Sequence, residues 1–417
     1  KKDEYDKPDR ITKIRKFLQK KHPMDDLRMN EVRFSVQKGS EFDALFAYWS
    51  GFLNKRSLNT RYFIRYANTP GIDAGGLTKQ FFTQIGKQMK ERYFKVAYNG
   101  SNRYILDSKK INSPDLAEFI GHILAVMIIK GLYIDFSLSI MYLATLMYNP
   151  DTFSDEEKFL YYILDLDNET RYDSYLKHCE KVYEYDKTQN IDVLEYDENY
   201  LKTMACTPAY VVKEYLPSVY TQNAEHLQAF IKGFFIKKKY FNSRFVNINS
   251  KIRIYDLDKL ISMPKLSKKY LKTKIFDNIR LTSSNNGRID EAHEDAAVYR
   301  YFKSIMIEDK KDEYTRMYHA YDKSLIEGPE EQARYDELAD PNNFKKAVLM
   351  FWSGTEGISE QQYSVAIYNL VGDSVKGHTC SNTLDMPMPN RVESKDRLFN
   401  IFMSLFIKDF QNIYNDA

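Results

Sequence analysis

The sequence predicts an α+β fold, with a mostly helical first half and a second region of mixed helix and strand patterns that a candidate linker separates from it. The chain has 417 residues, 43% of them hydrophobic and 29% charged, which is long enough for two or three domains with real cores. Apolar residues recur at helical spacing through most of its first half. Residues 260–274, which combine Pro264 with serines and a run of lysines, then separate this half from a region of mixed patterns.

The first ninety residues predict helices interrupted by two short strands. Residues 10–55 are expected to be mainly helical, because ITKIRKFLQKK and EFDALFAYWSGFL repeat apolar residues every three or four positions. Between them EVRFSV, residues 31–36, alternates like a strand, and RYFIRYAN, residues 61–68, is expected to form another. The turn-rich NTPGIDAGG follows, and a helix is expected to begin at Leu77.

The most apolar region, residues 115–148, predicts two buried helices that separate where Gly131 and Asp135 interrupt the pattern. Residues 155–232 have a helical, acidic and tyrosine-rich pattern. The stretch LQAFIKGFF, residues 227–235, is expected to be the end of an amphipathic helix.

The C-terminal part alternates between helix and strand patterns. The charged residues 307–341 are expected to form a surface excursion, most simply a solvated helical hairpin. KKAVLMFWSG predicts a helix that runs to Gly354, and QYSVAIYNL, residues 362–370, alternates like a strand. NTLDMP forms a short apolar face that stops at Pro387, and residues 397–410 predict a final helix.

The bulk composition argues against several classes of function. The 61 basic and 58 acidic residues give a net charge of +3, which does not fit a nucleic-acid footprint spread over the whole surface. Three cysteines cannot form a disulfide framework in a chain of this size, and they fit an intracellular, cytoplasmic location. No run of 18 apolar residues occurs, so no membrane span is expected.

Cys380, in the stretch KGHTCSNTLDMP, is the candidate reactive group. A thiol in polar, turn-like surroundings is more exposed and ionises more readily than a thiol in an apolar helix, although a buried inert cysteine is the alternative. Cys179 and Cys206 have no such polar loop around them. Gly377 is expected to open the approach to the thiol, and the nearest polar neighbours are His378, Thr379, Ser381 and Asn382.

Three chemistries can be compared for this thiol. A cysteine protease needs a base against the thiol, and His378 is a candidate, but protease nucleophiles usually begin a helix and here a short strand is expected. A zinc site needs about four ligands, and no second cysteine or paired histidine lies at useful spacing, so no metal or other cofactor is expected. Accepting an acyl group from a thioester requires only access, partial thiolate character and polar donors.

HTCSNTLDMP resembles the active-site signature of HECT-type ubiquitin ligases, HTCFNxLxLP. Ser381 replaces the aromatic residue of that signature, and Met386 replaces its second leucine. The residues that match are His378, Thr379, Cys380, Asn382, Leu384 and Pro387.

Further motifs of the same family occur in the same order over about residues 30–410. MFWSGTEGI resembles the LLxFxTGT segment, and GIDAGGLTKQFF resembles DxGGLxxEFF with Gln80 in place of glutamate. FIGHILAVMIIKGLYIDFSLS, residues 119–139, resembles a helix pair of the N-lobe. EVRFSV resembles the strand that opens this lobe, and LQAFIKGFF resembles the element that closes it.

The resemblance implies a bilobal HECT fold, in which a mostly helical N-lobe is joined by a flexible hinge to a smaller α/β C-lobe. It also implies a transfer mechanism. A ubiquitin-conjugating enzyme would pass ubiquitin to Cys380 as a thioester, and a lysine of a protein substrate would then attack that thioester. No cofactor is implied. The parts implied are a helical extension at 1–29, an N-lobe at 30–262 with the conjugating-enzyme-binding subdomain at about 155–225, a hinge at 263–266, and a C-lobe at 267–417 with a charged insertion at about 307–341.

The resemblance also implies roles for individual residues. Cys380 would be the nucleophile, and His378 and Thr379 would position the thioester or its oxyanion, or merely shape the loop. Asn382 would stabilise the backbone turn. Tyr414 lies near the end of the chain, where the family holds an aromatic residue that assists ligation, or it belongs to a frayed terminus.

Two binding surfaces are implied with fewer matching residues. The aromatic candidates for the conjugating-enzyme surface are equally well explained as helix-core residues; they are Phe159, Tyr161, Tyr162 and Tyr210. Tyr93 and Phe94 lie where some family members hold a second ubiquitin non-covalently. The alternative to a ligase is a catalytically inactive HECT-like scaffold or protein-interaction module, and the departures at Ser381 and Gln80 keep it open.

Overall fold

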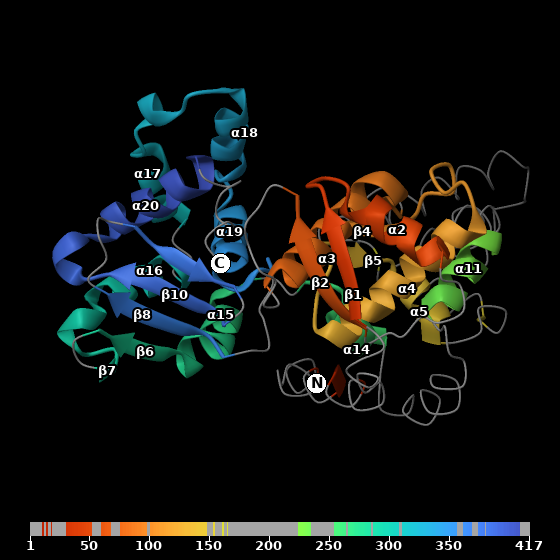
Figure 1. Ribbon diagram of the computed structural model, residues 1–417, viewed down its shortest axis with the longest axis horizontal. Helices are drawn as coiled ribbons and strands as arrows, with labels where there is room; N and C mark the ends of the chain where they lie inside the picture. Colours follow the sequence, from red (N-terminus) through yellow and green to blue (C-terminus); the bar gives the residue numbers. More distant parts are fainter. Residues whose placement is uncertain are drawn as a thin grey trace, which may run out of the picture. The chain divides into compact units, whose positions relative to one another are not determined.

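The computed structural model shows an α+β protein, with twelve α-helices and three small sheets in the part of the chain that it describes (Figure 1). The predicted mixture of helices and strands is therefore confirmed. The described residues are 11, 14–15, 18, 31–51, 60–67, 76–97, 101–147, 153–154, 161, 165, 224–234, 254–263, 266–284, 287–307, 311–356, 362–368, 374–379 and 381–408.

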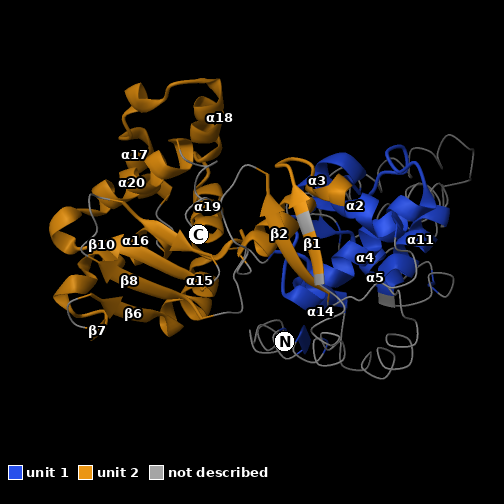
Figure 2. Ribbon diagram, in the orientation of Figure 1, with its two compact units in different colours: residues 1–23, 45–59, 86–263 blue, residues 24–44, 60–85, 264–417 orange. Residues whose placement is uncertain are grey.

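The chain forms two compact units (Figure 2). The first unit contains residues 1–23, 45–59 and 86–263, and the second unit contains residues 24–44, 60–85 and 264–417. Their last boundary, between Met263 and Pro264, lies inside the range predicted as the hinge. Residues 30–44 and 60–85 group with the second unit, whereas the motif resemblance implies that they belong with the rest of residues 30–262.

Two buried helices, α4 (Pro114–Lys130) and α5 (Ile140–Met147), form the centre of the first unit, as the apolar pattern predicts. Ser113 caps α4 by accepting a hydrogen bond from the Leu116 N–H at 3.3 Å, and a proline occupies the first helical position. Gly131 ends α4 in the left-handed conformation, with φ +73°. The predicted break at this glycine is confirmed, because a side chain would be strained there.

Helix α11 (Ala224–Phe234) packs closely along α4, and two glycines permit the approach. A Cβ atom on Gly121 of α4 would overlap the Phe230 carbonyl oxygen, and one on Gly233 of α11 would overlap the Glu118 carbonyl oxygen. The two backbones therefore touch where they cross. Helix α14 (Ile254–Ile261) packs against α5 and α4 and ends the first unit.

A small sheet completes the described part of the first unit. Strands β3 (Phe94–Val96) and β4 (Arg103–Leu106) are antiparallel, and β5 (Ser137–Leu138) runs parallel to β4. The ring centroids of Phe94 and Phe136 lie 4.9 Å apart, so aromatic side chains pack together at this sheet.

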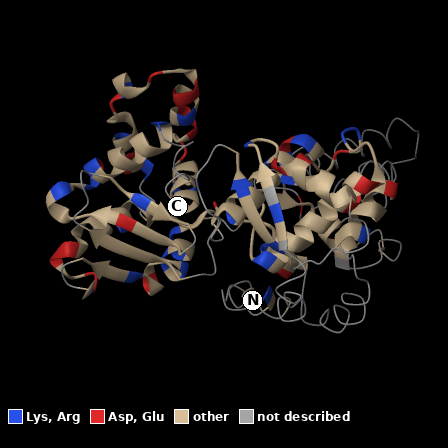
Figure 3. Cartoon of the chain, viewed as in Figure 1, with Lys and Arg blue, Asp and Glu red and all other residues tan. Residues whose placement is uncertain are grey.

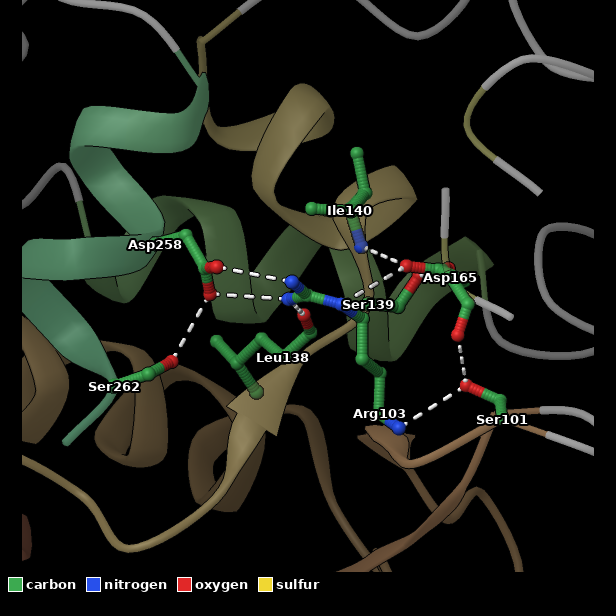
Figure 4. Close-up of polar contacts among 8 residues, drawn as sticks. All are labelled: Ser101, Arg103, Leu138, Ser139, Ile140, Asp165, Asp258 and Ser262. Carbon is green, nitrogen blue, oxygen red and sulfur yellow. Dashed lines mark hydrogen bonds and ion pairs between the residues drawn. The ribbon is translucent and has the colours of Figure 1, made fainter. Parts of the chain in front are cut away.

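Arg103 connects this sheet to the end of α14 (Figure 4). Its guanidinium forms a two-pronged contact with Asp258, with both nitrogen–oxygen distances 3.0 Å, and it also donates to the Leu138 carbonyl oxygen at 2.8 Å. The Ser262 hydroxyl donates to the same Asp258 carboxylate at 3.0 Å. Residue 262, immediately before the predicted hinge, is thus fixed to the first unit.

Asp165 lies on the other side of Arg103, with 3.8 Å between the Arg103 Nε and the Asp165 Oδ1 (Figure 4). Its carboxylate accepts hydrogen bonds from the Ser139 hydroxyl, at 2.5 Å, and from the Ile140 N–H. Burial raises the pKa of Asp165 to about 7, and these two hydrogen bonds and Arg103 oppose the rise without cancelling it.

The second unit is built on a five-stranded sheet of order β7-β6-β8-β10-β9. Strands β6, β8 and β10 are parallel, while β7 and β9 pair antiparallel at the two edges. Three successive residues of β8 are buried, because a central parallel strand is covered on both faces. The bounds are β6 (Arg280–Ser283), β7 (Gly287–Arg288), β8 (Ser364–Tyr368), β9 (Lys376–His378) and β10 (Thr383–Pro387).

Helices pack on this sheet as the periodicity predicts. Helix α19 (Pro341–Ser353) contacts β9 and β10, and α20 (Lys395–Lys408) packs on α16 (Ala297–Ile307). Helix α15 (Lys268–Lys274), capped by Ser267, begins the last segment of this unit, so the predicted linker 260–274 is shorter than its composition indicated. Short 3₁₀ helices lie at Phe276–Asn278, Glu294–Ala296, Lys323–Leu325 and Pro389–Arg391.

A second, two-stranded sheet contributes to the second unit. Strands β1 (Glu31–Val36) and β2 (Arg61–Tyr66) pair in parallel, which confirms both strand predictions. Helix α2 (Glu41–Gly51) begins in this unit and continues into the first, and so does α3 (Gly76–Tyr93), whose predicted start at Leu77 is confirmed within one residue.

The charged segment 307–341 is helical but contributes to the core, which corrects its prediction as a surface excursion. It contains α17 (Lys311–His319) and α18 (Pro329–Glu337), and Tyr318 and Tyr335 on them are buried. The two rings stack 4.4 Å apart, and each hydroxyl donates to the other residue's carbonyl oxygen. Charged residues of both signs lie interspersed over the helices (Figure 3). The high charge of the sequence therefore did not indicate that these helices have buried faces.

Candidate active site

The described residues of HTCSNTLDMP lie in strands β9 and β10 and in the connection between them, at one edge of the five-stranded sheet. His378 ends β9 and pairs with Thr383, which begins β10. The Ser381 N–H donates to the His378 carbonyl oxygen at 3.1 Å, which draws the chain on the two sides of position 380 together. Cys380 itself lies outside the described residues, so the site is defined by its chain neighbours.

Asn382 fixes the second half of this connection. Within the described residues it alone among non-glycine residues has a positive φ, +50°, in the left-handed region that asparagine tolerates. Its carbonyl oxygen accepts from the Trp352 indole N–H at 2.8 Å and from the Ser364 N–H at 3.0 Å. Asn382 is fully buried, so its geometry fits the turn-stabilising role implied by the resemblance.

His378 forms a polar pair with Asp385. The His378 Nε2 lies 2.8 Å from the Asp385 Oδ2, across the β9–β10 ladder. Because the position opposite His378 is Thr383, Asp385 is its diagonal neighbour on the same face of the sheet. The His378 side chain is 38% exposed while that of Asp385 is 14% exposed. The carboxylate thus orients an imidazole that solvent can reach.

A chain of hydroxyl groups runs beside the connection. The Ser381 hydroxyl donates to the Thr383 hydroxyl at 2.9 Å, and the Thr383 and Ser364 hydroxyls lie 2.8 Å apart. Ser381, which replaces the aromatic residue of the signature, is exposed. The substitution therefore places a polar, hydrogen-bonded group next to Cys380 rather than an apolar ring.

Lys79, in the first turns of α3, reaches this connection within the second unit. Its ammonium donates to the Thr379 carbonyl oxygen at 3.2 Å and to the Asn382 Oδ1 at 3.1 Å. It also donates to the Ser353 carbonyl oxygen at the end of α19, at 3.2 Å. No local pattern predicts this contact, because 300 residues separate Lys79 from Thr379.

Gly377 has a packing role at this site. A Cβ atom at this position would overlap the Phe351 carbonyl oxygen, so Gly377 permits β9 to lie directly against the end of α19. Because Cys380 lies outside the described residues, the expected opening toward the thiol stays a prediction. Thr379, two residues further on, is buried, at 5% exposure.

The structure describes three of the remaining predicted residues, and all three belong to the first unit. Tyr93 and Phe94 are buried in the first unit, which corrects their prediction as a surface for a second ubiquitin. Tyr161 is half-buried, and its ring makes an edge contact with Phe153 at 5.5 Å. Four others lie outside the described residues, and they are Phe159, Tyr162, Tyr210 and Tyr414.

Comparisons with known proteins add no assignment. No protein-family model matches the chain, and a search of curated proteins finds no match. Among the described residues, no group of three or more histidine, cysteine, aspartate or glutamate side chains is placed to hold a metal ion. Within the same residues, no helix has the length and apolar character needed to cross a membrane.

Proposed function

We propose that the chain is a ubiquitin-protein ligase that accepts ubiquitin from a conjugating enzyme as a thioester on Cys380 and transfers it to a lysine of a protein substrate. The observation that carries this proposal is the connection between β9 and β10. Two residues near Cys380 that match the HECT signature make specific local interactions. Asp385 orients the His378 imidazole, and Asn382 adopts the left-handed conformation of the turn.

The first step is an exchange between a thiol and a thioester. The Cys380 thiolate attacks the carbonyl carbon that links ubiquitin to the conjugating enzyme, a new carbon–sulfur bond forms, and the enzyme's thiolate leaves. Such an exchange is close to balanced in free energy, so its rate depends on thiolate availability and on positioning rather than on driving force. The hydrogen bonds that Thr379 and Asn382 accept on the two sides of Cys380 favour such positioning.

The second step transfers ubiquitin to an amine. A neutral lysine amine attacks the Cys380 thioester, an amide forms, the Cys380 thiolate leaves, and one proton is lost from the amine. His378, half-exposed and held by Asp385, accepts this proton as a general base. Positioned general bases contribute on the order of 10²–10⁴-fold to such steps.

A hinge at 263–266 joins the N-lobe and C-lobe in this proposal. Ser262 is tied to Asp258 on one side of it, and the Ser267 hydroxyl caps α15 on the other side by accepting from the Tyr270 N–H at 3.3 Å. A short connection anchored at both ends concentrates bending in few residues. The bilobal HECT arrangement is part of the proposal.

The test compares the effects of substituting each of the three cysteines of the chain. The protein is mixed with ubiquitin, activating enzyme and a panel of conjugating enzymes, and a ubiquitin adduct is sought that reductant removes. Cys380→Ala should abolish it, whereas Cys179→Ala and Cys206→Ala are matched controls that should retain it. Cys380→Ser should give an oxygen ester that resists reductant but is cleaved by alkali.

A further variant separates the two steps. Asp385→Asn leaves Cys380 in place but removes the carboxylate that orients His378. The thioester should still form, while its discharge to free lysine should slow by about tenfold or more. An inactive scaffold would give no adduct with any conjugating enzyme, and that result would reject the ligase in favour of the interaction protein.

A further inference from the structure

Lys79 makes an unusual set of contacts for a lysine at the start of a helix. One ammonium group donates to the carbonyl oxygens of Ser353 and Thr379 and to the side-chain oxygen of Asn382, all between 3.1 and 3.2 Å. An ammonium has three N–H donors and no acceptor, so it is suited to gathering several oxygens at one point. These oxygens come from two segments, the end of α19 and the β9–β10 connection.

The acceptors lie on both sides of the reactive position. Thr379 directly precedes Cys380, and Asn382 follows it by two residues. The contact is reinforced by close packing, since a Cβ on Gly354 would lie 3.1 Å from the Gly76 carbonyl oxygen and 3.3 Å from the Thr379 Cβ. The first turns of α3, the cap of α19 and Thr379 are thus in direct contact within the second unit.

The contacts also place positive charge next to the reactive segment. The Thr379 carbonyl that Lys79 binds is bonded directly to the backbone nitrogen of Cys380. The first turn of α3 contains no acidic residue, so the positive end of the helix dipole adds to the ammonium charge. A cation beside a thiol favours the thiolate, which is the nucleophilic form.

We propose that Lys79 is a positioning residue for Cys380: it holds the Thr379 carbonyl on one side of this residue and the Asn382 side chain on the other, and it supplies the positive charge that favours the Cys380 thiolate. Lys79 keeps its own proton throughout and takes no part in bond making. The role of Lys79 in ubiquitin transfer rests on the proposed function, but its effect on the reactivity of Cys380 can be measured without ubiquitin.

The experiment measures how fast iodoacetamide alkylates Cys380 as a function of pH. It uses the full chain with Cys179→Ala and Cys206→Ala, so that one thiol reacts. Lys79→Met should move the midpoint of the pH–rate profile upward and slow alkylation near neutral pH by about three- to tenfold. The matched control is Lys87→Met, two turns further along α3, which should leave the profile unchanged.

Two further variants keep the inference testable if Lys79→Met does not fold. Lys79→Gln keeps hydrogen-bond donors without charge and should also move the midpoint upward. Lys79→Arg keeps the charge and should retain the midpoint. A profile that is unchanged in the neutral variants, or moved equally by Lys87→Met, would overturn the inference.

Failure of this inference is distinct from failure of the proposed function. If Lys79→Met moves the profile while the parent chain forms no ubiquitin adduct, the positioning role stands and the ligase does not. If the adduct forms on Cys380 but the alkylation profile ignores Lys79, the ligase stands and the positioning role is overturned.

Discussion

Replacing Asp165 by asparagine should remove a pH dependence of stability from the first unit. The Asp165 carboxyl is fully buried between the Ser139 hydroxyl, the Ile140 N–H and Arg103, and burial raises its pKa from 3.8 to about 7. Between these two values the folded chain holds a proton that the unfolded chain has released. The contribution of Asp165 to the free energy of unfolding is therefore fully present below pH 3.8. This contribution is lost as the pH rises through about 7.

The size of the effect follows from the width of that window. A difference of roughly three pKa units corresponds to ~4 kcal/mol of unfolding free energy, at ~1.4 kcal/mol per unit. Asparagine has nearly the same shape and stays neutral, so Asp165→Asn should be more stable than the native chain at pH 8. At pH 4 both side chains are uncharged in the folded protein. The unfolding free energies of the native chain and Asp165→Asn should then differ by no more than one neutral hydrogen bond, ~1 kcal/mol.

Urea denaturation at a series of pH values, followed by tryptophan fluorescence, measures this effect. The chain has two tryptophans, Trp49 in the first unit and Trp352 in the second, so a Trp352→Phe background reports on the first unit alone. The native chain should lose stability from pH 5 to pH 8 relative to Asp165→Asn. The matched control is Asp115→Asn, which changes an exposed carboxylate in the first turn of α4 that water already solvates.

The reasoning fails if Asp165→Asn and the native chain show the same slope of unfolding free energy against pH. It also fails if Asp115→Asn flattens the slope as much, since the effect would then belong to overall charge rather than to the buried carboxyl.

Three further substitutions test local packing and helix capping within each of the two units. Gly121→Ala should destabilise the first unit by ~1–3 kcal/mol in urea denaturation, because its Cβ meets the Phe230 carbonyl oxygen; an unchanged midpoint would contradict the close helix crossing. Gly377→Ala should destabilise the second unit by a similar ~1–3 kcal/mol through the Phe351 carbonyl oxygen, read from that unit's own tryptophan. Ser113→Ala should cost ~1 kcal/mol by removing the cap of α4, and Ser113→Asp should restore it; equal loss in both variants would exclude capping as the cause.

Local patterns in the sequence were sufficient wherever the structure depends on neighbours in the chain. The alternation in EVRFSV predicted β1, and the glycines at 131 and 354 predicted the ends of α4 and α19, where both adopt positive φ. The same locality explains the error over residues 307–341. Charged residues dominate that segment, yet tyrosines spaced along its helices face the core, and a charge count does not report on spacing.

The parts of the site that depend on distant residues could not be predicted. Lys79 lies far along the chain from Thr379, and no pattern around either residue signals their contact. Gly377 was interpreted from its small size alone, whereas its packing role is set by the carbonyl oxygen of Phe351 on another element. The polar residues around Cys380 did predict a turn, in which Thr379, Ser381 and Asn382 lie, because residues that shape a turn are close together in sequence.

The central claim is that ubiquitin is carried on one sulfur atom, and peptide mapping of the loaded protein tests it most directly. After a brief reaction with activating enzyme, conjugating enzyme and ubiquitin, an acid quench preserves thioesters, and the fragments are identified by mass. The account predicts the C-terminus of ubiquitin on the fragment that contains Cys380, removable by thiol reductant. Ubiquitin found on Cys179, on Cys206 or on lysines alone would contradict it.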